Sequence, residues 1–176
     1  MTAAQNNVDH GIAIQTGKGS ATITDNFNTD TVTVTATAAG TIIDVGSANF
    51  VVHSAVGANT MTGGTGHNSY AYDATADSTP SAHDTITNFH VATDTIDFSA
   101  ISGLNSSNQA VTINFLTATP TSIAPHTIDV VTIGANTTVY ADASGKSESI
   151  SANHQDMQIN LSGVTAMSTS DFILHM

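Results

Sequence analysis

A glycine-rich turn in the middle of the chain carries the residue types of a calcium site. Residues 61–73 read MTGGTGHNSYAYD, and Gly64 and Gly66 allow the backbone to turn tightly enough for its carbonyl oxygens to surround an ion. A turn of this kind normally has a carboxylate two residues after its last glycine. Here that residue is Asn68, whose side-chain oxygen can coordinate calcium but brings no charge.

Two groups of oxygen-bearing residues around this turn are candidate calcium ligands. The first group is the turn with its neighbours: Asn59, Gly64, Gly66, Asn68 and Asp73. The second group is acidic: Asp84, Asp94 and Asp97. Clustered acids need a counter-charge, and because the chain has only two Lys or Arg residues, a cation is the natural one. The alternative is that these acids are solvated turn residues or strand caps.

The overall charge excludes several classes of partner. Against two Lys and no Arg stand 14 Asp or Glu residues, so the formal net charge is −12. Nucleic acids and anionic membrane surfaces are bound through Lys and Arg, which argues against both. No apolar run is long enough for membrane insertion. Because 40% of the residues are apolar, the chain is not a disordered acidic tail.

Large apolar residues recur at a nine-residue period that predicts the architecture around the turn. The series is Val34, Ile43, Val52, Met61 and Tyr70. Four positions before each of the last four members stands a small residue: Ala39, Ala48, Gly57 and Gly66. This is the register of the nonapeptide repeat of a parallel β-roll, in which each copy forms a corner and a short strand with one large apolar side chain pointing inward. The alternation TVTVTATA at residues 31–38 also indicates a strand.

The segment that follows the turn carries a family resemblance. Residues 84–89 read DTITNF and residues 94–99 read DTIDFS, while DMQINLSGVTAMSTSDFILHM ends the chain at residues 156–176. Together with the glycine-rich turn, these segments resemble the C-terminal domain of RTX proteins, particularly that of the serralysins. The chain departs from the family pattern where Asn68 and Asn88 replace aspartates and Ala92 replaces a glycine. These changes predict weaker or fewer calcium sites than in typical relatives.

The resemblance implies an all-β fold in two stretches. A degenerate nonapeptide β-roll or β-solenoid is expected over residues 1–75, followed over residues 76–176 by a β-sandwich-like region of hairpins that continues the same domain. It also implies Ca²⁺ as the bound ion and export by the type I secretion machinery, which reads a signal at the extreme C-terminus. The expected location is therefore extracellular or on the bacterial cell surface.

Other chemistries find little support in the sequence. No nucleophile elbow is present, and GKS at residues 145–147 lacks the first glycine of a P-loop because Tyr140 stands there. No catalytic or organic cofactor-binding residues are predicted, so we expect a protein that is not an enzyme. The chain has eight histidines, and His53 with His67 on nearby coils would make one imaginable metal-binding pair. The absence of paired histidine motifs favours isolated surface histidines instead.

Two functions fit these observations. The first is a secreted structural protein that binds copies of itself, with calcium assisting, to form a filament, surface layer or matrix. The uncapped stretch HGIAIQTGKGSATIT at residues 10–24 would then pair with a neighbour. The second is a non-catalytic calcium-binding module of a larger secreted enzyme that serves folding, secretion or the binding of a cell-surface polysaccharide. A hydrolase is a third, minor alternative.

Overall fold

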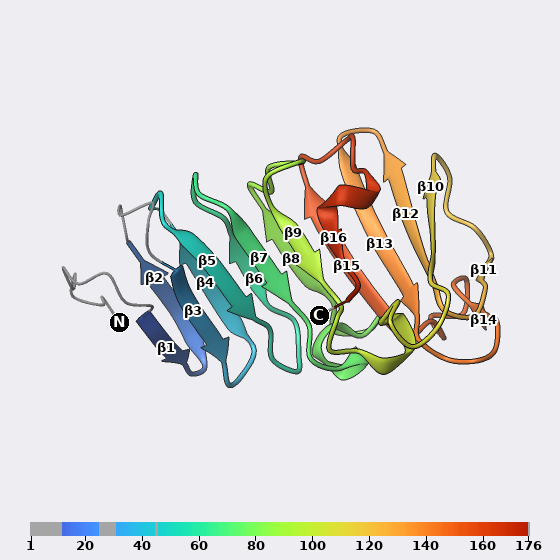
Figure 1. Cartoon of the computed structure of the whole chain (residues 1–176), viewed down its shortest axis with the longest axis horizontal. Helices are drawn as coiled ribbons and strands as arrows, with labels where there is room; N and C mark the ends of the chain where they lie inside the picture. The colour runs from blue at the N-terminus through green and yellow to red at the C-terminus, as the bar shows by residue number, and fades with distance from the viewer. Residues whose placement is uncertain (1–11, 25–30, 45, 176) are drawn as a thin grey trace.

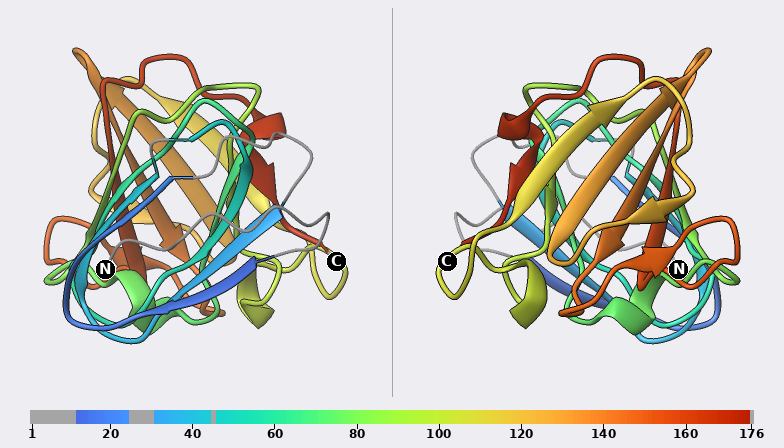
Figure 2. Two further views of the ribbon diagram at one scale, coloured as in Figure 1. Left: turned by 90° about the vertical axis from the view of Figure 1, so that its left-hand side faces the viewer. Right: turned by 90° about the vertical axis from the view of Figure 1, so that its right-hand side faces the viewer.

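The computed structural model describes residues 12–24, 31–44 and 46–175, and they form two β-sheets that share one interior. Viewed along the long axis of the molecule, the sheets lie on opposite sides of this interior (Figure 2). The predicted all-β fold with a parallel β-roll is confirmed. Within the described residues, no helix is long and apolar enough to cross a membrane.

The eight-stranded sheet runs along the whole length of the described molecule, whereas the six-stranded sheet ends with β16 near its middle (Figure 1). The six-stranded sheet contains, in spatial order, β1 (Ile12–Thr16), β3 (Thr31–Ala36), β5 (Asn49–His53), β7 (Asn68–Ala71), β9 (Thr95–Asp97) and β16 (Phe172–Ile173). The eight-stranded sheet contains β10 (Thr112–Leu116), β12 (Thr127–Ile133), β13 (Asn136–Asp142), β15 (Met157–Ser162), β8 (Asp84–Thr87), β6 (Thr60–Thr62), β4 (Gly40–Asp44) and β2 (Gly19–Ile23). A small third sheet pairs β11 (Ser122–Ile123) with β14 (Glu148–Ser149). Three single-turn 3₁₀ helices connect strands: η1 (Thr75–Ser78), η2 (Ser102–Leu104) and η3 (Thr169–Asp171).

Successive strands from β1 to β9 alternate between the two sheets, so one coil of the roll contains two nine-residue half coils. Val34, Val52 and Tyr70 are stacked partners in the six-stranded sheet, 18 residues apart. In the other sheet the partner of Met61 is Ile42, which is buried, whereas Ile43 pairs with Thr62. The residue that pairs with Met61 is therefore Ile42, one position before the member of the nine-residue series. Ile42 lies eight residues after Val34 and ten residues before Val52. The two half coils therefore differ in length but still add to one full coil of 18 residues.

The small residues at the corners permit one coil to lie directly on the next. A Cβ atom added to Gly66 would overlap the carbonyl oxygen of Ala48 in the coil below. A Cβ added to Gly57 would lie 2.8 Å from the Cβ of Ala39, and Gly57 also has a φ of +107°, which favours glycine. The sequence-based prediction that these positions must be small is explained by this stacking.

Replacing the corner glycine is expected to destabilise the roll. Because the Cβ of Gly66→Ala meets backbone rather than a movable side chain, the coils must separate locally, and we expect a loss of about 2 kcal/mol or more in the free energy of unfolding. Urea denaturation followed by circular dichroism measures the change. Gly17→Ala is the matched control, since a Cβ at Gly17 meets nothing within 4 Å. Equal stability of the two variants would contradict the stacking argument.

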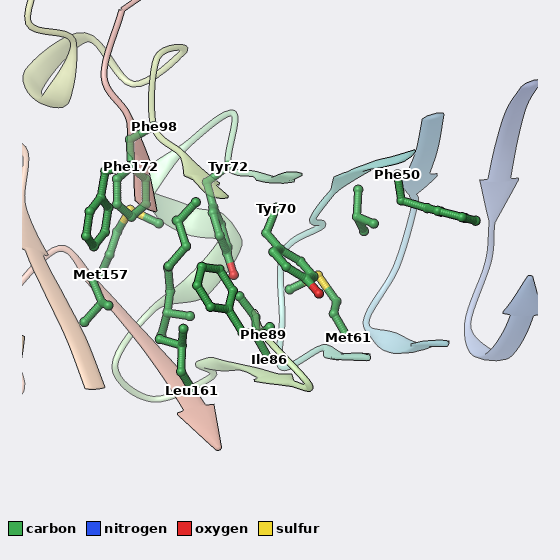
Figure 3. Packing of buried hydrophobic residues seen from close by; sticks show 14 of the residues in the cluster. Phe50, Met61, Tyr70, Tyr72, Ile86, Phe89, Phe98, Met157, Leu161 and Phe172 are labelled. Atoms are coloured by element: carbon green, nitrogen blue, oxygen red, sulfur yellow. The ribbon is translucent and has the colours of Figure 1, made fainter. Parts of the chain in front are cut away.

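The interior is a continuous row of apolar side chains from the roll into the C-terminal region (Figure 3). The ring of Tyr70 lies 6.0 Å from that of Phe89, and the ring of Tyr72 lies 5.8 Å from that of Phe98. Phe98 in turn stacks on Phe172 near the end of the chain, at 6.4 Å. These contacts join segments far apart in the sequence into one core.

The C-terminal strands extend the sheets of the roll. β15 pairs in parallel with β8 and antiparallel with β13, and β13 and β12 form a hairpin. β10 then pairs in parallel with β12 at the far end of the eight-stranded sheet. β16 returns to the middle of the molecule and pairs in parallel with β9. The division at residue 75 that the sequence analysis placed within one continuous domain stays a prediction.

Candidate functional site

One asparagine at a corner of the roll contacts one of the carboxylates that the sequence analysis assigned to calcium. Asn59 is only 2% exposed and directly precedes β6. Its side-chain Nδ2 donates hydrogen bonds to the carbonyl oxygens of Ala55 (2.7 Å) and Gly57 (2.9 Å) within the turn. The same nitrogen donates to Oδ1 of Asp84 on the neighbouring coil at 3.1 Å. The Oδ1 of Asn59 accepts from the backbone N–H of Gly40, so the amide is fully satisfied.

A second asparagine repeats this arrangement half a coil later, at the opposite edge of the roll. Asn68 begins β7, and its Nδ2 donates to the carbonyl oxygens of Gly64 (3.4 Å) and Gly66 (3.2 Å). It also donates to Oδ1 of Asp94 at 3.0 Å, and the backbone N–H of Asn68 donates to the same oxygen at 2.9 Å. We call the two clusters, Asn59 with Asp84 and Asn68 with Asp94, the amide corners.

The carboxylates of the amide corners are buried in surroundings that disfavour their charge. Burial raises the pKa of Asp84 to about 6, although hydrogen bonds from Ser54 and Asn59 act in the opposite direction. Burial likewise raises the pKa of Asp94, opposed by the backbone N–H groups of His90 and Asn68. Both aspartates are fully buried, so the hydrogen bonds that they accept are what keeps their ionised forms inside the protein.

The amide corners, as they stand, do not fit a calcium ion at their centres. Calcium would be held by the turn carbonyls and the aspartate oxygens together. Those oxygens already accept hydrogen bonds from Nδ2 of Asn59 or Asn68, so an ion at either centre requires the amide group to rotate away. The amide nitrogen, as a hydrogen-bond donor, performs the bridging that a cation would perform. The assignment of these residues as calcium ligands stays a prediction.

This combination of a β-roll, corner turns and an extended C-terminal region has a counterpart among known families. The family model described as Peptidase M10 serralysin C terminal matches residues 7–174. The chain belongs to the serralysin C-terminal family. No curated protein matches the chain significantly. The serralysin C-terminal domain is the non-catalytic part of these proteases; such RTX-type domains belong to secreted proteins, are linked to type I secretion and typically bind calcium.

Two of the predicted ligands lie apart from the amide corners of this serralysin C-terminal domain. Asp73 is exposed, and its Oδ2 lies 3.0 Å from Nδ1 of His53. Asp97 is half-buried, and its Oδ1 accepts the backbone N–H of Ser99 at 2.8 Å. The predicted grouping of Asp84 with Asp94 therefore differs from the observed contacts. Asp84 accepts a hydrogen bond from Asn59, and Asp94 accepts one from Asn68.

Two further departures from the family pattern are accommodated locally. Ala92, which replaces a glycine, has a φ of +63°, and Asn88 has a φ of +58°. Asparagine tolerates this left-handed conformation better than other residues with a side chain, whereas alanine adopts it at a cost. The backbone N–H of Ala92 donates to the buried carboxylate of Asp171 at 2.6 Å, and this contact with the C-terminal segment holds the strained turn in place.

The two histidines that the sequence suggested as a metal-binding pair have separate partners at their Nδ1 atoms. Nδ1 of His53 lies next to Asp73, and Nδ1 of His67 lies 3.2 Å from the carbonyl oxygen of Thr93. Nδ1 of His126 lies 3.0 Å from the carbonyl oxygen of Gly103. His10 lies outside the described residues. The predicted absence of catalytic residues and transition metals stays a prediction.

A cluster that the sequence analysis missed lies in the C-terminal region. Asp142, Glu148 and Asp156 each offer a carboxylate oxygen, and these oxygens all lie within 4.8 Å of one another. The available signal in the sequence was the short polar segment DASGKSE at residues 142–148, which has an acid at each end. The third member is eight residues further on, so its proximity depends on strand pairing that the sequence does not reveal directly.

Proposed function

We propose that this chain is an extracellular, non-catalytic structural unit that associates with copies of itself by adding strands to the ends of its sheets. The observation that carries the proposal is the pair of edge strands, β2 and β10, that end the eight-stranded sheet within the described residues. They lie at opposite ends of the long axis (Figure 1). Each presents backbone N–H and C=O groups on one side that no described strand pairs.

The composition of these two strands favours pairing with another chain. β2 reads GSATI and β10 reads TINFL, so neither contains a charge or a proline, the usual protections of an edge strand. Phe115 on β10 is 45% exposed. Because β2 and β10 are different surfaces, pairing β2 of one copy with β10 of the next is heterologous and leaves a free edge at each end. Such contacts extend into a filament rather than close into a dimer.

The net charge of −12 opposes association, and this is where calcium would assist. A divalent ion that neutralises part of the acidic charge reduces the repulsion between copies. We therefore expect assembly in calcium after export through the type I machinery, with the cell surface or the extracellular matrix as the final location.

Charging the β2 edge is expected to abolish assembly. Ser20 and Thr22 are exposed on β2, and the double variant Ser20→Lys, Thr22→Lys places two lysines on the edge. Electron microscopy and light scattering of the purified chain in calcium should show polymers for the natural sequence and monomers for this variant. The matched control, Ala100→Lys with Ala124→Lys, changes the net charge equally at exposed loop positions and should still assemble.

A second function is favoured by the family match itself. Because the model describes the C-terminal part of proteases, the chain would serve as the folding and secretion module of a larger secreted enzyme, or would hold a cell-surface polysaccharide. A natural-sequence chain that remains a monodisperse monomer at high concentration in calcium would overturn self-assembly and leave this second function standing.

A further inference from the structure

The acidic cluster beyond the roll is built by the pairing of strands. Asp142 ends β13 and Asp156 directly precedes β15. These strands are antiparallel neighbours, and Ala141 lies opposite Met157. Asp142, which follows Ala141, and Asp156, which precedes Met157, therefore lie at the same end of the ladder. Glu148 begins β14, which the pairing of Ile123 with Glu148 ties to β11. Three separate strands therefore bring the three carboxylates together.

Two carboxylate oxygens of the cluster are buried without a hydrogen-bond partner. Asp142 is fully buried, and although its Oδ1 accepts the backbone N–H of Ser144 at 2.7 Å, its Oδ2 has no partner. The buried Oε2 of Glu148 also has none. Oδ2 of Asp156 accepts the backbone N–H of Ala143 at 2.8 Å. Leaving anionic oxygens buried and unpaired is unfavourable unless something positive binds them.

The described residues form no ion pair with the cluster. The ion pairs among them are those of His53 with Asp73 and His90 with Asp94. Burial and the charge of Asp156 raise the pKa of Asp142, opposed by the hydrogen bonds of Ser144 and by the nearby His126. Burial and the charges of Asp156 and Asp142 raise the pKa of Glu148, opposed by hydrogen bonds from Ser144 and from the backbone of Asp156. The three acids thus repel one another without an ion-pair partner among the described residues.

We propose that Asp142, Glu148 and Asp156 bind one calcium ion in the loop between β13 and β15. The donor set consists of carboxylate oxygens, with no nitrogen or sulfur ligand, which suits a hard cation rather than zinc or copper. The hydroxyl of Ser144, the backbone carbonyl oxygens of the loop and water complete the larger coordination number of calcium. This site lies outside the roll and does not depend on self-assembly.

Protease cleavage after lysine can report calcium binding at this site. Its two lysines are Lys18 and Lys146, and there is no arginine, so an endopeptidase specific for lysine has two cleavage positions. Lys146 is exposed in the proposed calcium loop, between Asp142 and Glu148, and Lys18 is exposed in the turn between β1 and β2. An ion that ties together both flanks of Lys146 restricts the local opening that a protease needs.

We expect calcium to slow cleavage after Lys146 at least tenfold at neutral pH and to leave cleavage after Lys18 unchanged. Digestion of the full chain with a calcium-independent lysine endopeptidase, in calcium, magnesium or chelator, is followed by mass spectrometry. Calorimetric titration with calcium on the same samples gives the affinity and the number of ions bound.

Two neutral variants and one control locate the ion. Glu148→Gln and Asp156→Asn should each lose one bound calcium and the protection of Lys146. Asp129→Asn makes the same chemical change at an acid on β12 outside the cluster and outside the predicted calcium ligands, and it should keep both. Cleavage at Lys146 that is equally fast with calcium and with chelator would overturn the proposal. Protection that survives in both neutral variants, or that disappears in Asp129→Asn, would also overturn it by placing the ion elsewhere.

Discussion

The variant Asn59→Asp is expected to make the folding of the roll depend on calcium. The substituted carboxylate replaces the amide that donates to Ala55, Gly57 and Asp84, so these oxygens and the new carboxylate face one another without the shared side-chain donor. Leaving a buried charge uncompensated in this way costs about 3–5 kcal/mol, and we expect a loss of that size in chelator. Calcium, which prefers oxygen ligands with carboxylates among them, should restore most of the loss.

Urea denaturation of the variant in chelator and in calcium measures both effects. Asn59→Ala is the matched control, because it removes the same hydrogen bonds but adds no charge. It should be destabilised to a similar extent in chelator and in calcium. A variant Asn59→Asp that is as stable as the natural chain in chelator would show that the amide does not occupy the position of a cation.

The second large effect is expected from pH. The pKa of Asp84 is about 6 in the folded chain, above its ordinary value of 3.8, so the folded state binds the proton more tightly than the unfolded state. The stability from this group is therefore fully present below pH 3.8 and is lost as pH rises through 6. A shift of about two units corresponds to about 3 kcal/mol. Asp94, Asp142 and Glu148 act in the same direction.

Urea denaturation between pH 4 and pH 7 in chelator tests this prediction. The natural chain should lose stability steadily as pH rises, and Asp84→Asn, which is neutral at every pH, should lose about 3 kcal/mol less. Thr85→Ala is the control, since it changes a side chain on the same strand without removing a titratable group, and its profile should be as steep as that of the natural chain. A profile of Asp84→Asn that is as steep as that of the natural chain would refute the assignment.

The sequence predicted the roll well because its signals are local. A large apolar residue every nine positions and a small residue at each corner follow directly from short strands that stack, and Gly66 above Ala48 shows why the corner must be small. The partner of Met61 lies one residue before the position given by the nine-residue count, because neighbouring half coils differ in length by two residues. Strand alternation, not a strict count from the previous coil, decides which side chain points inward.

The pairing of the candidate ligands could not be predicted because it depends on an insertion between coils. Asn59 meets Asp84, 25 residues later, rather than a residue 18 positions away, since the coil between them includes η1 and its flanking turns. In the sequence, Asp84, Asp94 and Asp97 are neighbours, but Asp84 begins β8 of the eight-stranded sheet, whereas Asp94 precedes and Asp97 ends β9 of the six-stranded sheet. The acidic cluster at Asp142 was missed for a related reason, because it depends on the register of β13 against β15.

The return of the last strand to the middle of the molecule gives folding a direction. β16 pairs with β9 through Phe172 and Ile96, and Asp171 beside it is buried against the turn at Ala92. A strand from a distant part of the sequence thus completes the six-stranded sheet that begins with β1. Until residues 172 and 173 have been synthesised, the side of β9 that pairs with β16 is exposed, so this sheet is completed only after strands β10 to β15 have been synthesised.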